Sequence, residues 1–131
     1  MRLLPAALAG VATLATLAGP AVAAVDPSIS VTPRRLILGD TAMIRGTSWV
    51  VGAGCSDRVV VRITGTIDGD RWTAPIGSRR VNPNTASFPA IRFTPPQSKF
   101  PGGRATIVAT QHCPADQGGN VVRRAPITLV K

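Results

Sequence analysis

The stretch Arg58-Val59-Val60-Val61-Arg62-Ile63-Thr64 has the side-chain alternation of a strand with one buried face. Its inward-facing residues would be Val59, Val61 and Ile63, and its outward-facing residues would be Arg58, Arg62 and Thr64. β-Branched side chains favour the extended chain. The turn signal Asp68-Gly69-Asp70 follows shortly afterwards. The stretch therefore predicts a half-buried β-strand that leads into a hairpin turn.

Similar short apolar or alternating segments recur along the chain, each ended by Gly, Pro, Asn or Asp. They cover residues 28–32, 41–48, 71–81, 87–94, 105–113 and 121–130. Segment 71–81 is the weakest and would be a strand pair or ribbon, because Pro75 and Gly77 interrupt it. About seven short strands in one domain predict an all-β, two-sheet antiparallel sandwich, with a small barrel as the alternative. The expected core residues are Ile29, Val31, Ile44, Val59, Val61, Ile63, Phe93, Ile107, Ala109, Ile127 and Leu129.

The first 24 residues differ from the rest of the chain. Arg2 is followed by an uncharged stretch rich in Leu, Ala and Val, which ends in the A-x-A pattern Ala21-Val22-Ala23. This pattern is typical of a secretory signal peptide cleaved after Ala23 or Ala24. We therefore expect a signal peptide at residues 1–23 and a domain at residues 24–131, with an uncleaved membrane anchor as the alternative. The product would be secreted, and either released or held non-covalently at the cell envelope.

The chain has two cysteines, Cys55 and Cys113. Two cysteines in an exported protein usually pair, and these would both lie toward one end of a sandwich. The disulfide would close a loop of about 59 residues and stabilise the fold by about 4 kcal/mol. The alternative is a reactive or metal-binding thiol in the pair His112-Cys113. Adjacent strand residues point to opposite faces, however, and no further Cys or His is present in the sequence to complete a site.

Side chains suited to catalysis are scarce, because the acidic residues are six Asp with no Glu, and His112 is the single histidine. His112 is not near the G-x-S-x-G pattern of a nucleophile elbow. Asp68-Gly69-Asp70 lacks the further oxygen ligands of a calcium site. The glycines of Gly52-Ala53-Gly54 precede a strand, whereas a phosphate-binding loop precedes a helix. We therefore predict that the protein is not an enzyme and has no catalytic residue, metal site or cofactor.

The chain carries a net charge of +9, to which Arg2 in the leader contributes one charge. Such a charge attracts polyanions in a salt-dependent manner, and outside a cell these are wall polymers, acidic lipids and nucleic acid. Arg58 and Arg62 on one strand and Arg124 on another are predicted to share an outward face. The alternative is a basic surface that is merely solvated. No recognition helix or basic–aromatic motif indicates specific nucleic-acid binding.

Trp49 and Trp72 are the largest flat side chains of the domain. Each is a candidate aromatic contact for a sugar ring or a small ligand, and the alternative is a position in or beside the core.

Several turn-and-strand motifs are spread over nearly the whole domain. They are Ser30-Val31-Thr32-Pro33, Leu38-Gly39-Asp40-Thr41, Ile44-Arg45-Gly46-Thr47-Ser48-Trp49, and Pro101-Gly102-Gly103 leading into residues 105–110 and Cys113. Together they resemble the small secreted immunoglobulin-like domains of actinobacteria, and this resemblance implies an immunoglobulin-like sandwich. The opening is also distantly similar to that of the enediyne chromophore-carrier apoproteins, which are secreted sandwiches with a ligand cleft. That family has two short-range disulfides, whereas this chain has one widely spaced Cys pair.

These features predict a non-enzymatic secreted binding module that associates with anionic cell-envelope polymers or with a protein partner. The alternative function is that of a small-ligand carrier, which would need a concave apolar pocket of several hundred Å³.

Overall fold

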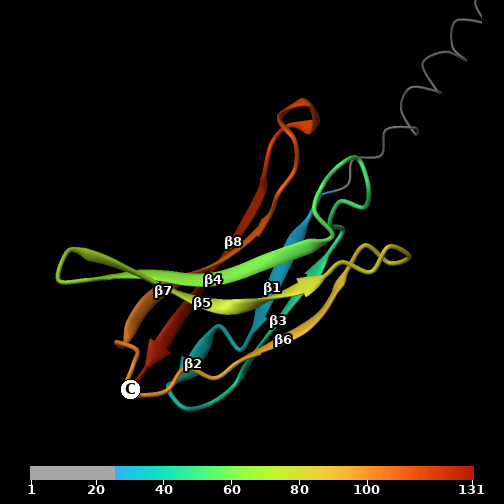
Figure 1. The fold of residues 1–131 in the computed structure, drawn as a ribbon. Helices are drawn as coiled ribbons and strands as arrows, with labels where there is room; N and C mark the ends of the chain where they lie inside the picture. Colours follow the sequence, from blue (N-terminus) through green and yellow to red (C-terminus); the bar gives the residue numbers. More distant parts are fainter. Residues whose placement is uncertain (1–25) are drawn as a thin grey trace, which may run out of the picture.

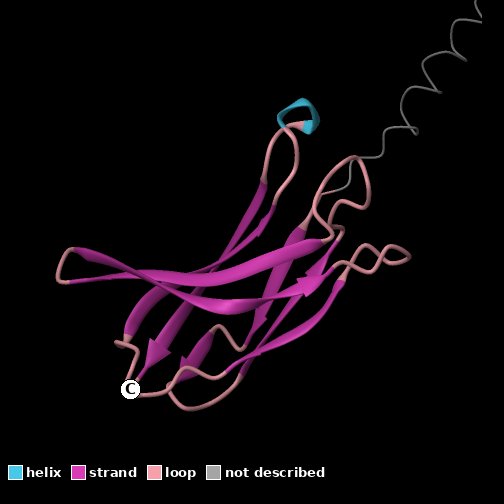
Figure 2. Ribbon diagram, viewed as in Figure 1, coloured by secondary structure: helices cyan, strands magenta, loops and turns pink. Residues whose placement is uncertain are grey.

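The structure is a computed structural model that describes residues 26–131. Its strands are Ser28–Thr32 (β1), Arg35–Ile37 (β2), Ala42–Thr47 (β3), Arg58–Ile67 (β4), Asp70–Arg80 (β5), Phe88–Phe93 (β6), Gly103–Gln111 (β7) and Val121–Val130 (β8). A 3₁₀ helix at Ala115–Gln117 (η1) is the only helix in this part of the chain (Figure 2). The predicted signal peptide at residues 1–23 lies outside the described residues.

The strands form two sheets, one of three strands in the order β1-β3-β6 and one of five strands in the order β2-β8-β7-β4-β5 (Figure 1). β3 and β6 in one sheet, with β8, β7 and β4 in the other, reproduce the central strands of an immunoglobulin-like sandwich. The predicted all-β sandwich is therefore confirmed. The hairpin of β4 and β5 extends well beyond the rest of the sandwich (Figure 1).

Two details of the strand prediction were wrong. β2 was not predicted, because three residues are too short to show an alternating pattern, and its pairing with β8 is parallel rather than antiparallel. Segment 71–81 is one continuous strand, β5, rather than a strand pair. β5 is an edge strand, and an edge strand tolerates Pro75 because one side of its backbone has no neighbouring strand.

The core lies between the sheets and consists of the inward-facing side chains of both. Of the predicted core residues, those that are buried are Val31, Ile44, Val59, Val61, Ile63, Phe93, Ile107, Ala109, Ile127 and Leu129. Ile29 is only partly buried and packs against the edge of this cluster. Hydrophobic alternation therefore identified ten core residues correctly but missed others, among them Leu36, Phe88 and Ile91. Burial of the core side chains is the main force that holds the sheets together.

Gly46 leaves room for the ring of Phe88 on the neighbouring strand β6, since a Cβ at this position would overlap that ring. We expect Gly46→Ala to lower the free energy of unfolding by about 2–3 kcal/mol, because Phe88 is buried and the core must rearrange to admit the methyl group. Urea denaturation measures the change. The matched control is Gly77→Ala, where a Cβ would meet only the Arg79 guanidinium at 3.9 Å. Equal stability of the two variants would contradict the prediction.

Cys55 and Cys113 form the predicted disulfide, with a Cα–Cα distance of 4.1 Å. Cys55 lies shortly before β4 and Cys113 shortly after β7. The bond therefore joins the loops that flank these two neighbouring strands, at one end of the five-stranded sheet. The buried side chain of Gln111 reinforces the same region. Its Nε2 donates to the carbonyls of Val50 at 2.7 Å and Ser56 at 2.8 Å, and its Oε1 accepts from the Val50 amide at 3.1 Å. Segment 50–56 is thereby fixed to β7 by both covalent and polar bonds.

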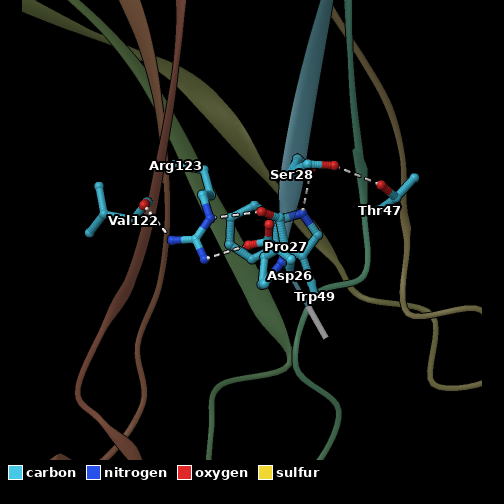
Figure 3. Close-up of polar contacts among 7 residues, drawn as sticks. All are labelled: Asp26, Pro27, Ser28, Thr47, Trp49, Val122 and Arg123. Carbon is cyan, nitrogen blue, oxygen red and sulfur yellow. Dashed lines mark hydrogen bonds and ion pairs between the residues drawn. The ribbon is translucent and has the colours of Figure 1, made fainter. Parts of the chain in front are cut away.

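Arg123 holds the beginning of the described chain against β8 (Figure 3). Its Nε donates to the Pro27 carbonyl at 2.7 Å, and its Nη2 pairs with the Asp26 carboxylate at 3.2 Å. The indole Nε1 of Trp49 donates to the Ser28 carbonyl at 3.2 Å from the other side. Arg123 is thus engaged within the fold, whereas its neighbour Arg124 is exposed on the opposite face of β8.

None of the helical structure among residues 26–131 is long and apolar enough to span a membrane.

Candidate anion-binding face

The outer face of the five-stranded sheet carries the basic residues predicted to act together. Along β4, Val59, Val61 and Ile63 are buried in the core, so the alternate residues Arg58 and Arg62 point outward. On β8, Ala125 is buried and Arg124 is exposed. The structure therefore places Arg58, Arg62 and Arg124 on one face, as the sequence predicted.

Arg62 and Arg124 lie in the same row across the sheet. Arg62 on β4 is opposite Val108 on β7, and Val108 is opposite Arg124 on β8. Val108 is only 3% exposed although it lies on the outer face, between the arginines of the two neighbouring strands. We call Arg62, Val108 and Arg124 the first row.

A second row of arginines, which the sequence did not reveal, crosses the same face. Arg71 on β5 is opposite Thr66 on β4. The last pair of β4 and β7 is Gly65 with Ala105, so the next residue on each strand brings Thr66 opposite Arg104. Arg104 is in turn opposite Thr128 on β8, and Thr128 is opposite Arg35 on β2. The second row is therefore Arg71, Thr66, Arg104, Thr128 and Arg35, with an arginine on every second strand.

The spacing of these charges follows from sheet geometry. Neighbouring strands are about 4.8 Å apart, so arginines on every second strand are separated by roughly 10 Å. The two rows are four residues apart along β4, which is roughly 13 Å. Between them lies an uncharged row of Thr73, Thr64, Thr106 and Pro126. We call the two rows and the residues between them the arginine face.

Acidic side chains do not neutralise the arginine face. Neither of the two ion pairs found among residues 26–131 involves an arginine of the two rows. Arg35, Arg62, Arg71, Arg104 and Arg124 are all exposed. Arg58 lies four residues before Arg62, and the arginine opposite it, Arg80, pairs with Asp57 at 3.2 Å. The unneutralised charge is thus concentrated in the two rows rather than around Arg58.

The arginine face is shallowly hollowed between its rows. One depression of about 330 Å³ is lined by residues that include Thr64, Arg71 and Arg104. A second, of about 310 Å³, is lined by residues that include Thr64, Arg71, Arg62 and Arg124. Both depressions are bordered by Thr64 and Arg71, so they lie next to each other, and guanidinium groups border both of them.

A separate groove of about 450 Å³ lies between β4 and β5, where the strand register shifts. Arg62 contributes to one side of it, but most of its lining is apolar. The lining residues are Val60, Val61, Arg62, Thr73, Ala74, Pro75, Gly77 and Ser78.

The two tryptophans occupy different places. Trp49 is 1% exposed and packs in the core with Phe88, so its ring cannot serve as a platform for a ligand, contrary to that hypothesis. Trp72 is partly buried at the core edge, in edge-to-face contact with Phe100 at a centroid distance of 5.8 Å. Its Nε1 is buried and has no hydrogen-bond partner within the described residues. Trp72 therefore closes one end of the core rather than presenting a flat aromatic surface.

Comparisons with known proteins leave the family of this chain open. No family model matches the sequence, and no curated protein matches it. The chain is similar in structure to the alkylpurine DNA glycosylase AlkC of Pseudomonas fluorescens, with 14% identity and a TM-score of 0.45 over 85% of this chain and 32% of that one. It is also similar to the CARDB domain of the PF1109 protein from Pyrococcus furiosus, with 19% identity and a TM-score of 0.41 over 80% of this chain and 93% of that one. A third similar structure is the sporulation control protein Spo0M of Bacillus subtilis, with 17% identity and a TM-score of 0.42 over 81% of this chain and 49% of that one. The chain thus spans about a third of the glycosylase and about half of Spo0M, and similarity at this level carries no functional argument.

Proposed function

We propose that this protein is a secreted, non-enzymatic binding module whose arginine face binds a linear anionic polymer of the cell envelope. The observation that carries the proposal is the pair of arginine rows on the outer face of the five-stranded sheet, for which residues 26–131 provide no ion-pair partner. The export of the protein is inferred from the leader-like residues 1–23 and is supported by the disulfide, a bond typical of oxidising compartments.

A polymer is a better ligand for this face than a small anion. The depressions are shallow and the arginines are exposed, so each single contact is weak in water. A polymer that touches several arginines at once adds these contacts together and releases counterions, which gives useful affinity without a deep pocket. Thr106 lines one of the depressions, and its hydroxyl can also donate a hydrogen bond to an anionic group. The hydroxyls of Thr64 and Thr73 already donate to backbone carbonyls, so they do not add to this contact.

The test compares two variants that lose the same number of charges. The face variant is Arg62→Gln, Arg71→Gln, Arg104→Gln and Arg124→Gln combined. We expect it to bind inorganic polyphosphate about 100-fold more weakly, because each exposed arginine that is removed weakens binding by about threefold. The slope of log affinity against log salt should fall by about 3. Fluorescence anisotropy with labelled polyphosphate across a salt series measures both quantities.

The control variant carries the same loss of charge on other parts of the surface. Arg45 and Arg92 lie on the three-stranded sheet, and Arg34 and Lys99 lie in loops, all of them exposed. Combined substitution of these four residues by Gln should weaken polyphosphate binding less than tenfold. Equal losses in the two variants would show that net charge alone attracts the polymer, and would overturn the proposal of a specific face.

The groove between β4 and β5 favours the second function expected from the sequence, carriage of a small ligand. Its volume of about 450 Å³ lies within the range of ligand sites, and its lining is mainly apolar.

A further inference from the structure

We propose that the groove between β4 and β5 binds an amphiphilic anion, an alkyl carboxylate whose chain lies along the groove and whose head group meets Arg62. This site does not depend on polymer binding by the arginine face, although Arg62 contributes to both. The proposal rests on how the groove forms, on its apolar lining and on the charge at its border.

The groove exists because β5 contains one residue more than β4 needs. Val61 is opposite Gly77 and Arg62 is opposite Pro75, so Ile76 is left over as a bulge. A bulge bends the strand and increases its local twist, which parts the side chains on the outer face. Gly77 contributes only backbone atoms to the lining of the groove. The groove is therefore a fixed feature of the backbone and would exist before any ligand arrives.

The lining of the groove suits an alkyl chain. Val60 is 52% exposed, which is an unfavourable position for a large aliphatic side chain that has no partner. Pro75 on the neighbouring strand is exposed as well. A chain lying between Val60 and Pro75 would remove both apolar surfaces from water, and each methylene buried in this way adds to the affinity.

The charge around the groove selects an anionic head group. Arg62 is the charged residue among those that line it, and no acidic side chain lines it. Arg58 lies on the same face of β4 two residues from Val60, with its Nη1 at 3.5 Å from the Ser78 hydroxyl that also borders the groove. Arg58 and Arg62 therefore place positive charge on both sides of Val60 along β4. A carboxylate head group would be attracted to this charge, whereas an ammonium head group would be repelled.

The first experiment measures the ligand preference of the unaltered protein by isothermal titration with hexanoate, octanoate, decanoate and octylammonium. We expect the affinity for the carboxylates to rise two- to fourfold for each added methylene. Octylammonium should bind at least tenfold more weakly than octanoate. Affinity that does not depend on chain length, or equal binding of the two octyl compounds, would overturn the proposal.

The second experiment places the ligand by substitution. Val60→Asn should weaken decanoate binding at least tenfold, because it replaces the exposed apolar side chain in the groove by a polar one of similar size. The matched control is Ile67→Asn, which alters another half-exposed aliphatic residue of β4 that does not line the groove. This control should leave decanoate binding within twofold of the unaltered protein. Equal loss in the two variants would place the ligand elsewhere and overturn the proposal.

Two further measurements separate this site from other occupants. Polyphosphate affinity should stay within twofold in Val60→Asn, so that failure of the groove site and failure of the arginine face give different results. Decanoate should shift the amide resonances of Val60, Thr73 and Ser78 more than those of β1 and β6 in a ¹⁵N spectrum. If sedimentation instead shows a dimer that Val60→Asn disrupts, the groove is covered by a second copy of the chain and the ligand proposal is wrong.

Discussion

Replacement of both disulfide cysteines, Cys55→Ala with Cys113→Ala, is expected to lower the free energy of unfolding by about 4 kcal/mol. The residues are 58 positions apart, so the bond restricts a large part of the unfolded chain. In the chain-entropy treatment a loop of this length reduces the entropy of the unfolded state by an amount equivalent to about 4 kcal/mol. Because domains of this size are stabilised by only about 5–15 kcal/mol in total, the variant would be close to the limit of stability.

Guanidinium denaturation followed by the fluorescence of the buried Trp49 measures this loss. The dependence of stability on denaturant, the m value, should increase in the variant, because an unfolded chain without the crosslink exposes more surface. Far-UV circular dichroism in the absence of denaturant should be unchanged, since the strands do not require the bond. A loss of less than 1 kcal/mol with an unchanged m value would contradict this account.

The strands and the core could be predicted from sequence because they depend on local alternation. Arg58–Thr64 shows this most clearly, since every second residue is buried as its pattern indicated. The disulfide could also be predicted, because a chain with one Cys pair has a single way to form an internal disulfide. β2 escaped prediction because its place at the sheet edge is decided by pairing with β8, at the other end of the chain.

The arginine face could be predicted only in part. Outward orientation of Arg62 and Arg124 follows from alternation within each strand, but which residues come opposite one another depends on the register of the whole sheet. Arg35, Arg71 and Arg104 lie on three different strands and enter one row only through the intervening pairs. No local pattern around these three residues indicates that they will lie together.

Two features of the sequence predict more than the positions of the strands. A proline and a glycine inside an edge strand, here Pro75 and Gly77, indicate a bulge as well as an interruption of the strand. Gln111 follows Ile107 and Ala109 at the same spacing of two, which places it on the buried face of β7. A buried amide must be hydrogen-bonded, so this position alone predicts a structural role for Gln111.

Gln111→Leu is expected to lower the free energy of unfolding by about 3 kcal/mol. Leucine fills a similar volume, but it leaves the Val50 amide and the carbonyls of Val50 and Ser56 without the partners that Gln111 provides. Each unpaired group costs about 1–3 kcal/mol where it stays buried and less where water reaches it, and Val50 and Ser56 are only half-buried. Urea denaturation measures the loss, and the exposed residue Gln97 provides the control, with a change below about 0.5 kcal/mol expected for Gln97→Leu.

Gln111→Glu tests whether the amide itself is required rather than its shape. One carboxylate oxygen would replace Oε1 and still accept from the Val50 amide, but the other would face the two carbonyl oxygens that Nε2 now bonds. Two acceptors repel each other, and the residue would also bring an unpaired charge into a site that is fully buried. Gln111→Glu should therefore be at least as destabilising as Gln111→Leu at neutral pH. It should also keep the m value of the unaltered protein, unlike the cysteine variant, because the disulfide still restricts its unfolded chain. Stability near that of the unaltered protein would mean that segment 50–56 does not need the Gln111 amide, and that the disulfide and the hydrogen bond from the Ser56 amide to the His112 carbonyl at 2.7 Å are enough to hold it.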